Sequence, residues 1–138
     1  MGTVLFPLFN YINAFATGET DMNKQYPGLT AKAIQTYLAR GAATPSALRN
    51  QECGGLPDAA RNYLSRISLE DFRDIDGETL KRTLDKHTES LMAEFPYKAR
   101  KNWGAARKVI NIFLKLVCFN RYVAPEYQMD KIENYLEV

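Results

Sequence analysis

This chain contains few cysteine and histidine residues, which in other proteins form disulfides or bind metals and cofactors. Its 138 residues include two cysteines, Cys53 and Cys118, and a single histidine, His87. Two cysteines so far apart in sequence do not make a disulfide framework, and with one histidine they cannot supply the spacings of a zinc site. Walker, G-x-G-x-x-G and G-x-S-x-G motifs are also missing. The residues therefore imply no metal and no cofactor, and we assign no catalytic residue.

Long apolar runs without interruption are missing as well. The first 18 residues carry no charge, but Pro7, Asn10 and Asn13 break the apolar stretch and no basic residue precedes it. This pattern disagrees with a secretory signal and with a membrane span, and it favours a core-packing helix over Val4–Ala16. We therefore expect a cytoplasmic protein with reduced cysteines and no membrane partner.

Patterns typical of β-strands are absent. No extended run alternates between apolar and polar residues, and no Asn-Gly or Asp-Gly turn joins two β-rich runs. Helical spacing is widespread instead. Start and stop signals predict one helix with Thr30 as its N-cap and Gly41 just past its end, and another over Pro57–Arg66. The composition, 46% apolar and 25% charged, is that of a globular domain.

Two long helices dominate the second half of the predicted fold. The first covers Gly77–Phe95 with Asp76 as N-cap, because five of its side chains fall on one stripe: Leu80, Leu84, His87, Leu91 and Phe95. The second begins between Tyr97 and Trp103 and runs to about Val123. It is apolar nearly all round from Val109 to Phe119, which is typical of a helix surrounded by others. We expect an all-α globule of six to eight helices, one domain over residues 1–138, packed around residues 103–123.

Charge is unevenly distributed, although the formal net charge is only +2. Residues 19–96 hold 10 Lys and Arg against 12 Asp and Glu, whereas residues 97–138 hold 8 against 4. Between Tyr97 and Pro125 there are seven cations and no carboxylate. An asymmetry of this kind is typical of a protein with an anionic partner.

The start of this cationic region has the features of a phosphate-binding surface. Lys101, Lys108 and Lys115 repeat every seven residues and share a stripe of the predicted helix. Basic side chains near a helix start can hold phosphates, and an aromatic side chain can stack on a base. The candidate nucleic-acid-binding residues are Lys98, Arg100, Lys101, Trp103, Gly104, Arg107 and Lys108. Two alternatives stay open: the cations form the wet face of a half-buried helix, or they pair with the acidic segment Glu70–Glu78.

The last part of the chain contains two segments of interest, WGAARKVINIFLKL (residues 103–116) and KIENYLEV (residues 131–138). Here a glycine-bearing turn enters an apolar helix, and residues 95–138 thereby resemble the C-terminal half of helix-hairpin-helix DNA glycosylase domains. The resemblance implies a helical fold with Gly104 and the adjacent basic residues facing a DNA backbone. The family's hairpin has two glycines where Gly104 stands alone, and its catalytic aspartate would follow beyond Val138. We therefore expect a non-catalytic or truncated relative.

One further motif, RTLDKH, places Arg82 and His87 at an Arg-x4-His spacing. This spacing is similar to that of HEPN-type helical ribonucleases, in which the arginine steadies phosphate and the histidine transfers protons. His87 lies on the apolar stripe and Arg82 is displaced from it, so a hydrogen-bonded core histidine is the favoured interpretation.

We therefore expect a small, non-catalytic helical protein that binds the backbone of DNA or RNA. The first alternative is a protein-interaction module, an inhibitor or adaptor that binds a protein partner. The second is a HEPN-like ribonuclease.

Overall fold

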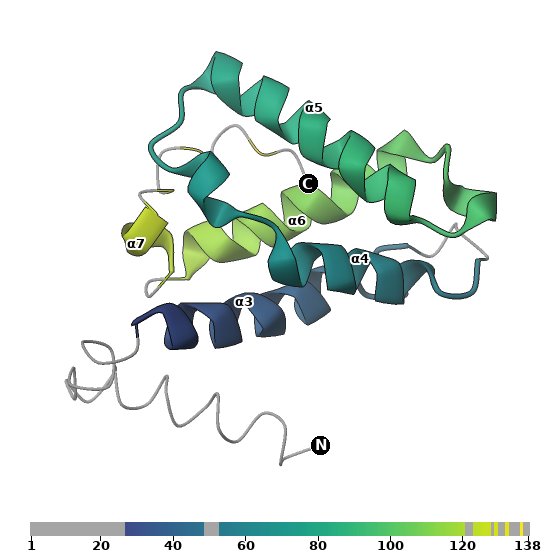
Figure 1. The fold of residues 1–138 in the computed structure, drawn as a ribbon, viewed down its shortest axis with the longest axis horizontal. Coiled ribbons are helices and arrows are strands. Elements are labelled where there is room, and N and C mark those ends of the chain that lie inside the picture. The colour runs from purple at the N-terminus through teal and green to yellow at the C-terminus, as the bar shows by residue number, and fades with distance from the viewer. Residues whose placement is uncertain are drawn as a thin grey trace, which may run out of the picture. The chain divides into compact units, whose positions relative to one another are not determined.

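Helices are the regular secondary structure of this protein wherever its structure is described. The computed structural model describes residues 27–48, 53–120 and 123–127, together with Met129, Ile132 and Leu136. The α-helices are α3 (Pro27–Ala42), α4 (Leu56–Arg66), α5 (Gly77–Glu94), α6 (Trp103–Phe119) and the one-turn α7 (Ala124–Tyr127), and the 3-10 helices are η1 (Leu69–Phe72) and η2 (Tyr97–Ala99) (Figure 1). These residues contain no strand. The predicted all-α class is confirmed for them, whereas the number of six to eight helices stays a prediction, because the expected helix over Val4–Ala16 lies outside them.

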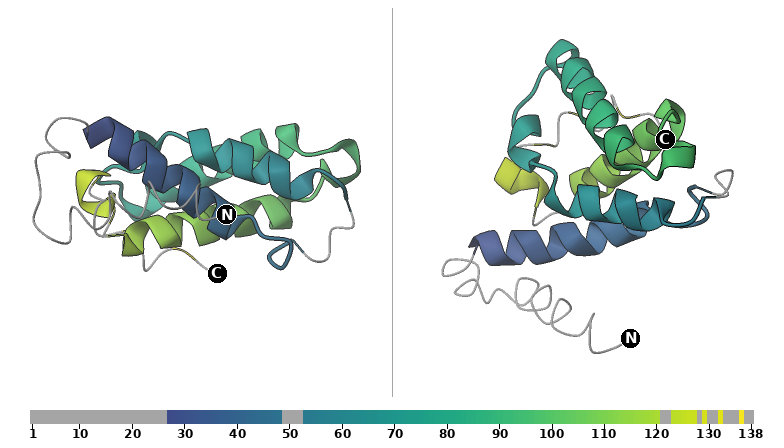
Figure 2. Two further views of the ribbon diagram at one scale, coloured as in Figure 1. Left: turned by 90° about the horizontal axis from the view of Figure 1, so that it is seen from below. Right: turned by 45° about the vertical axis from the view of Figure 1, so that its right-hand side comes forward.

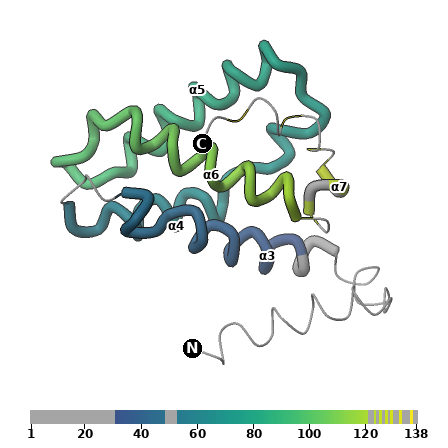
Figure 3. The backbone as a smooth tube through the Cα atoms, turned by 180° about the vertical axis from the view of Figure 1, so that it is seen from behind, coloured from purple at the N-terminus to yellow at the C-terminus, as the bar shows by residue number. Residues whose placement is uncertain are grey.

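The chain divides into two units, Met1–Ile34 and Gln35–Val138. The described residues of the first unit, 27–34, belong to α3. In the second unit α4, α5 and α6 pack pairwise on one another, and α7 packs against α6 and η1. Views from two other directions and from behind show α5 and α6 side by side (Figures 2 and 3). The expectation of a single domain over the whole chain stays a prediction.

Helix α5 begins after the predicted N-cap and buries the predicted apolar stripe. The Asp76 side chain accepts a hydrogen bond from the Thr79 N–H at 2.8 Å, which satisfies one of the free donors of the first turn. The stripe is buried along its length: Leu80, Leu84, His87, Leu91 and Phe95. The helix ends at Glu94, because Pro96 disfavours helical backbone at the residue before it. Both the predicted cap and the predicted stripe are confirmed.

Among the described helices, α6 contributes the most buried residues. Its cap is Asn102, whose side chain accepts from the Ala105 N–H at 2.9 Å. Eight of its residues are buried, and each large apolar side chain among them, such as Phe113 or Leu114, contributes about 1.5–3 kcal/mol. The predicted end near Val123 is wrong: Asn120 leaves the helical conformation and its side chain accepts from the Val123 N–H at 3.0 Å.

The predicted start of the helix after residue 26 is also wrong. Helix α3 begins at Pro27, whose fixed φ suits the first helical position, so Thr30 lies inside the helix rather than at its N-cap. Gly41 lies in the last turn of α3, not beyond it. Helix α4 begins at Leu56, one residue before the predicted start at Pro57.

The buried amide of Gln35 holds the end of α4. Its Nε2 donates to the carbonyl oxygens of Leu64 at 3.0 Å and Ile67 at 2.9 Å. These carbonyls belong to the last turn of α4 and the residue just after it, where no further helical N–H reaches them. One side chain therefore satisfies two carbonyls at a helix end.

Candidate nucleic-acid interface

The connection between α5 and α6 carries three of the seven candidate residues, and the first turns of α6 carry the other four. Phe95 is buried at its start, and tight backbone bonds follow, from the Ala99 N–H to the Pro96 carbonyl at 2.9 Å and from the Asn102 N–H to the Ala99 carbonyl at 3.0 Å. These turns fold the backbone inward at Ala99, which is buried. The cations on either side, Lys98, Arg100 and Lys101, are exposed.

The expected lysine stripe is only partly realised. Helix α6 begins at Trp103, so Lys108 and Lys115 share its helical register, whereas Lys101 lies in the turn before the cap. The same holds for Arg100 and Arg107, of which only Arg107 is helical. The prediction of one continuous basic stripe is wrong, because Asn102 interrupts the helix between the two groups.

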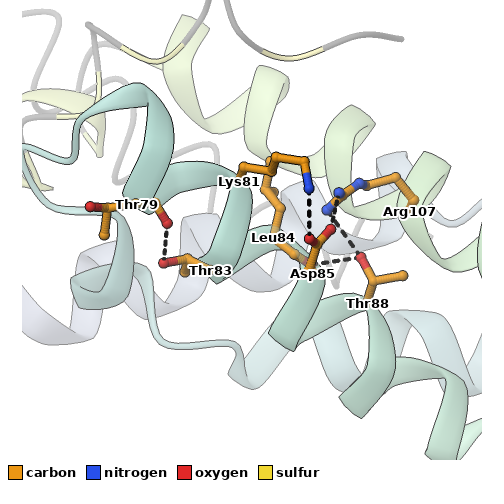
Figure 4. A network of polar contacts seen from close by, with 7 residues as sticks. All are labelled: Thr79, Lys81, Thr83, Leu84, Asp85, Thr88 and Arg107. Atoms are coloured by element: carbon orange, nitrogen blue, oxygen red, sulfur yellow. Dashed lines mark hydrogen bonds and ion pairs between the residues drawn. The ribbon is translucent and has the colours of Figure 1, made fainter.

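Arg107 is engaged inside the protein. Its Nη2 donates to the carboxylate of Asp85 on α5, its Nη1 donates to the Thr88 hydroxyl at 3.3 Å, and its side chain is only 16% exposed (Figure 4). The guanidinium carbon also lies 4.8 Å from the centre of the Trp103 ring, a cation–π contact. Internal pairing therefore occurs, but with Asp85 rather than with the acidic segment Glu70–Glu78.

The other four cations of the candidate set face water. Lys98, Arg100, Lys101 and Lys108 are exposed, and in the described part of the chain none of them forms an ion pair. The Arg100 Nε donates to the Phe95 carbonyl at 3.4 Å, which steadies the stem of that side chain along the connection.

Two aromatic side chains and a glycine complete the surface. Tyr97 is 86% exposed and Trp103 is 44% exposed, both unusually high for rings of this size. Gly104 is exposed in the first turn of α6, and a Cβ built there would come no closer than 3.7 Å to the Asn102 Oδ1. Packing therefore does not require glycine at this position.

A pocket opens between α5 and α6 beside this surface. Its volume is about 410 Å³, and its lining residues are Gly77, Leu80, Lys81, Leu84, Trp103, Arg107 and Asn111. The Lys81 Nζ donates to Asp85 at 3.2 Å, so Lys81 and Arg107 share one carboxylate (Figure 4). Partial burial acts to raise the pKa of Asp85, but hydrogen bonds and charge from these two cations outweigh it and lower that pKa. Asp85 is therefore ionised at neutral pH.

Sequence reasoning missed this pocket, although two signals were present. Lys81 and Asp85 lie four residues apart, the spacing of an ion pair on one helix face. Asn111 is a polar residue within an apolar helix, and such a residue often marks a polar site in a core. Neither signal reveals that Arg107 joins the pair from another helix.

His87 lies in a different network, in the core. It is 8% exposed, its Nε2 lies 2.9 Å from an Asp71 carboxylate oxygen, and its Nδ1 lies 2.6 Å from the Tyr63 hydroxyl oxygen. Because a carboxylate only accepts, Nε2–H donates to Asp71. A ring that carries its single proton on Nε2 then accepts from the Tyr63 hydroxyl through Nδ1. The Phe72 ring stacks on His87 with centroids 5.4 Å apart.

The interpretation of His87 as a satisfied core histidine is confirmed by these contacts. Arg82, its partner in the Arg-x4-His motif, is exposed and contacts Thr79 at 3.5 Å. Burial raises the pKa of Tyr63, and a hydrogen bond with Ser90 opposes that shift. The Tyr63 hydroxyl therefore keeps its proton at neutral pH and remains a donor to His87.

Among the described residues no group of three or more His, Cys, Asp or Glu side chains could hold a metal ion. Cys53 is a free thiol, and the Cys118 Sγ donates to the Met129 carbonyl oxygen at 3.3 Å. No helix in this part of the chain is both long enough and apolar enough to cross a membrane. Comparisons of the chain with protein-family models, with characterised proteins and with solved structures give no significant match.

Proposed function

We propose that this protein binds the phosphate backbone of a nucleic acid through the connection between α5 and α6 and the first turns of α6. The observation that carries the proposal is the set of four exposed cations, Lys98, Arg100, Lys101 and Lys108, which have no ion-pair partner in the described part of the chain. Cations without an internal carboxylate are available to displace counterions from phosphates.

The surrounding side chains favour contact with the backbone over readout of base pairs. Lysines act as flexible point charges and do not fix a bidentate geometry on a base edge. Arginine is the residue type best suited to bidentate base contact, but Arg107 is held by Asp85 and Thr88, and the Nε of Arg100 donates to the Phe95 carbonyl oxygen. Tyr97 and Trp103 add exposed rings that can stack on unpaired bases without selecting among them.

The test is a salt titration of binding to labelled duplex DNA, single-stranded DNA and single-stranded RNA by fluorescence anisotropy. The test variant carries Lys101→Gln and Lys108→Gln. The matched control carries Lys81→Gln and Lys86→Gln, which remove the same charge from exposed lysines of α5. If both test lysines contact phosphates, the slope of log K against log salt flattens by about 1.8 for duplex DNA and about 1.4 for single strands, whereas the control keeps the original slope.

Equal slopes for the two double variants, or no binding to any of the three probes, would overturn the proposal. In that case stable capture of one protein after nuclease treatment would favour the alternative of a protein-interaction module. Strong discrimination among duplex sequences would contradict the absence of base readout.

The role of Gly104 can be tested separately. Gly104→Ala removes the glycine without a steric clash and should stabilise α6 by about 0.5–1 kcal/mol. If the backbone at Gly104 approaches a phosphate, as the helix-hairpin-helix resemblance implies, the variant is more stable yet binds less tightly. Unchanged affinity would remove Gly104 from the interface and leave the lysine test as the criterion for the proposal.

A further inference from the structure

The pocket between α5 and α6 combines an apolar wall with two cations. Leu80 and Leu84 of α5 and Trp103 of α6 contribute apolar surface. Lys81 and Arg107 contribute the cationic groups, and in Figure 4 these two side chains approach Asp85 from different helices. Its volume of about 410 Å³ falls within the range of small-molecule sites.

The charges at this pocket do not cancel. Asp85 supplies one negative charge against the two positive charges of Lys81 and Arg107, and the lowered pKa of Asp85 keeps that carboxylate ionised. The remaining lining residues are uncharged. The lining and Asp85 together therefore carry a net charge of +1, which one monoanion would neutralise.

Hydrogen-bond donors also remain at these two cations. A guanidinium has five N–H donors, and contacts within the described chain use two of those on Arg107; an ammonium has three, and Asp85 takes one from Lys81. Because the Arg107 side chain is only 16% exposed, its other donors have limited access to bulk water. Such donors favour a bound acceptor group.

We propose that this pocket binds a small organic monoanion with an apolar body, of the arylalkyl carboxylate class. The carboxylate accepts hydrogen bonds from Lys81 and Arg107, and the aryl group packs against Leu80, Leu84 and Trp103. This site shares Trp103 with the proposed nucleic-acid interface, but neither of its two cations belongs to the four exposed cations of that surface.

The test compares two probes that differ in charge, 4-phenylbutyrate and 4-phenylbutan-1-ol. Trp103 is the only tryptophan of the chain and lines the pocket, so its fluorescence reports binding directly. We expect a saturable change in Trp103 emission with 4-phenylbutyrate and roughly tenfold weaker binding of the alcohol, the effect of one charge-assisted hydrogen bond.

A variant at the rim of the pocket ties the signal to this site. Lys81→Gln should weaken 4-phenylbutyrate binding about threefold, a modest effect because the Lys81 side chain is 78% exposed. Lys86→Gln removes the same charge from an exposed lysine of α5 outside the lining and should leave the affinity unchanged. Equal affinities for the acid and the alcohol, equal effects of the two lysine variants, or no saturable response would each overturn the proposal.

Discussion

Replacing His87 by phenylalanine tests whether this histidine is a structural or a catalytic residue. The substitution keeps an aromatic ring that can stack on Phe72 but removes both ring nitrogens. In the intact protein one of these nitrogens donates to Asp71 and the other accepts from Tyr63. The variant therefore removes two hydrogen bonds while largely preserving the packing of the core.

The expected loss of stability in His87→Phe depends on how exposed the two hydrogen-bond partners, Tyr63 and Asp71, are to solvent. The Tyr63 hydroxyl belongs to a buried side chain, and leaving it without His87 costs about 1–2 kcal/mol, because Ser90 offers an alternative partner. The Asp71 side chain is 40% exposed, so its carboxylate returns to water and adds at most about 1 kcal/mol. We expect His87→Phe to lower the free energy of unfolding by about 1–3 kcal/mol.

A double-mutant cycle with Tyr63→Phe separates the hydrogen bond from the packing. Each single variant leaves one buried polar group without its partner, whereas the double variant leaves neither. The double variant should therefore cost about 1 kcal/mol less than the sum of the single variants. The free energies come from urea denaturation followed by far-UV circular dichroism at neutral pH.

Two results would refute this reasoning. Strictly additive costs would show that the short contact between Tyr63 and His87 contributes nothing to stability. RNA cleavage by the intact protein that His87→Phe abolishes without loss of stability would identify His87 as a catalytic residue and support the HEPN-like alternative.

Two further predictions concern caps and buried amides. Asp76→Asn keeps a capping side chain but removes the titrating carboxyl group. The hydrogen bond from the Thr79 N–H lowers the pKa of Asp76. The charged carboxylate therefore stabilises the fold above about pH 4, and this stabilisation is lost as the pH falls further. The urea midpoint of the native protein should exceed that of the variant at pH 7, and this difference should shrink as the pH falls below about 4. A constant difference would contradict the role of this carboxylate. Gln35→Met should lower the free energy of unfolding by about 1–3 kcal/mol, because the carbonyls of Leu64 and Ile67 lose their donor; a cost below about 0.5 kcal/mol in urea denaturation would be inconsistent with these bonds.

Local signals predicted most of α5 and the apolar part of α6. The Asp76 cap, the stripe from Leu80 to Phe95 and the apolar run after Val109 depend on residues within a few positions of one another. Such patterns report which face of a helix is buried. The errors fell at boundaries, as at Thr30 and beyond Phe119, where one side-chain hydrogen bond or one proline decides where a helix begins or ends.

The contacts that shape the candidate sites could not be predicted in this way. Gln35 bonds to carbonyls 29 and 32 residues further along the chain, and Tyr63 meets His87 across 24 residues. These pairs depend on how the helices pack, which periodicity alone does not specify. The single histidine was assigned correctly to the core because its own helix placed it there, but its two partners were not identified.

Periodicity alone also does not reveal the contacts of the cationic region. Helix packing there separates the candidate residues into two groups with different proposed functions. Residues 97–125 contain no carboxylate, yet packing of α5 on α6 brings Asp85 to Arg107 from 22 positions earlier in the chain. The absence of acid from a sequence segment therefore does not leave all of its cations available to an external partner. Arg107 joins Lys81 at the pocket, whereas Lys101 and Lys108 stay exposed. Neutralising Lys101 and Lys108 should consequently alter the salt dependence of nucleic-acid binding without changing the affinity for 4-phenylbutyrate.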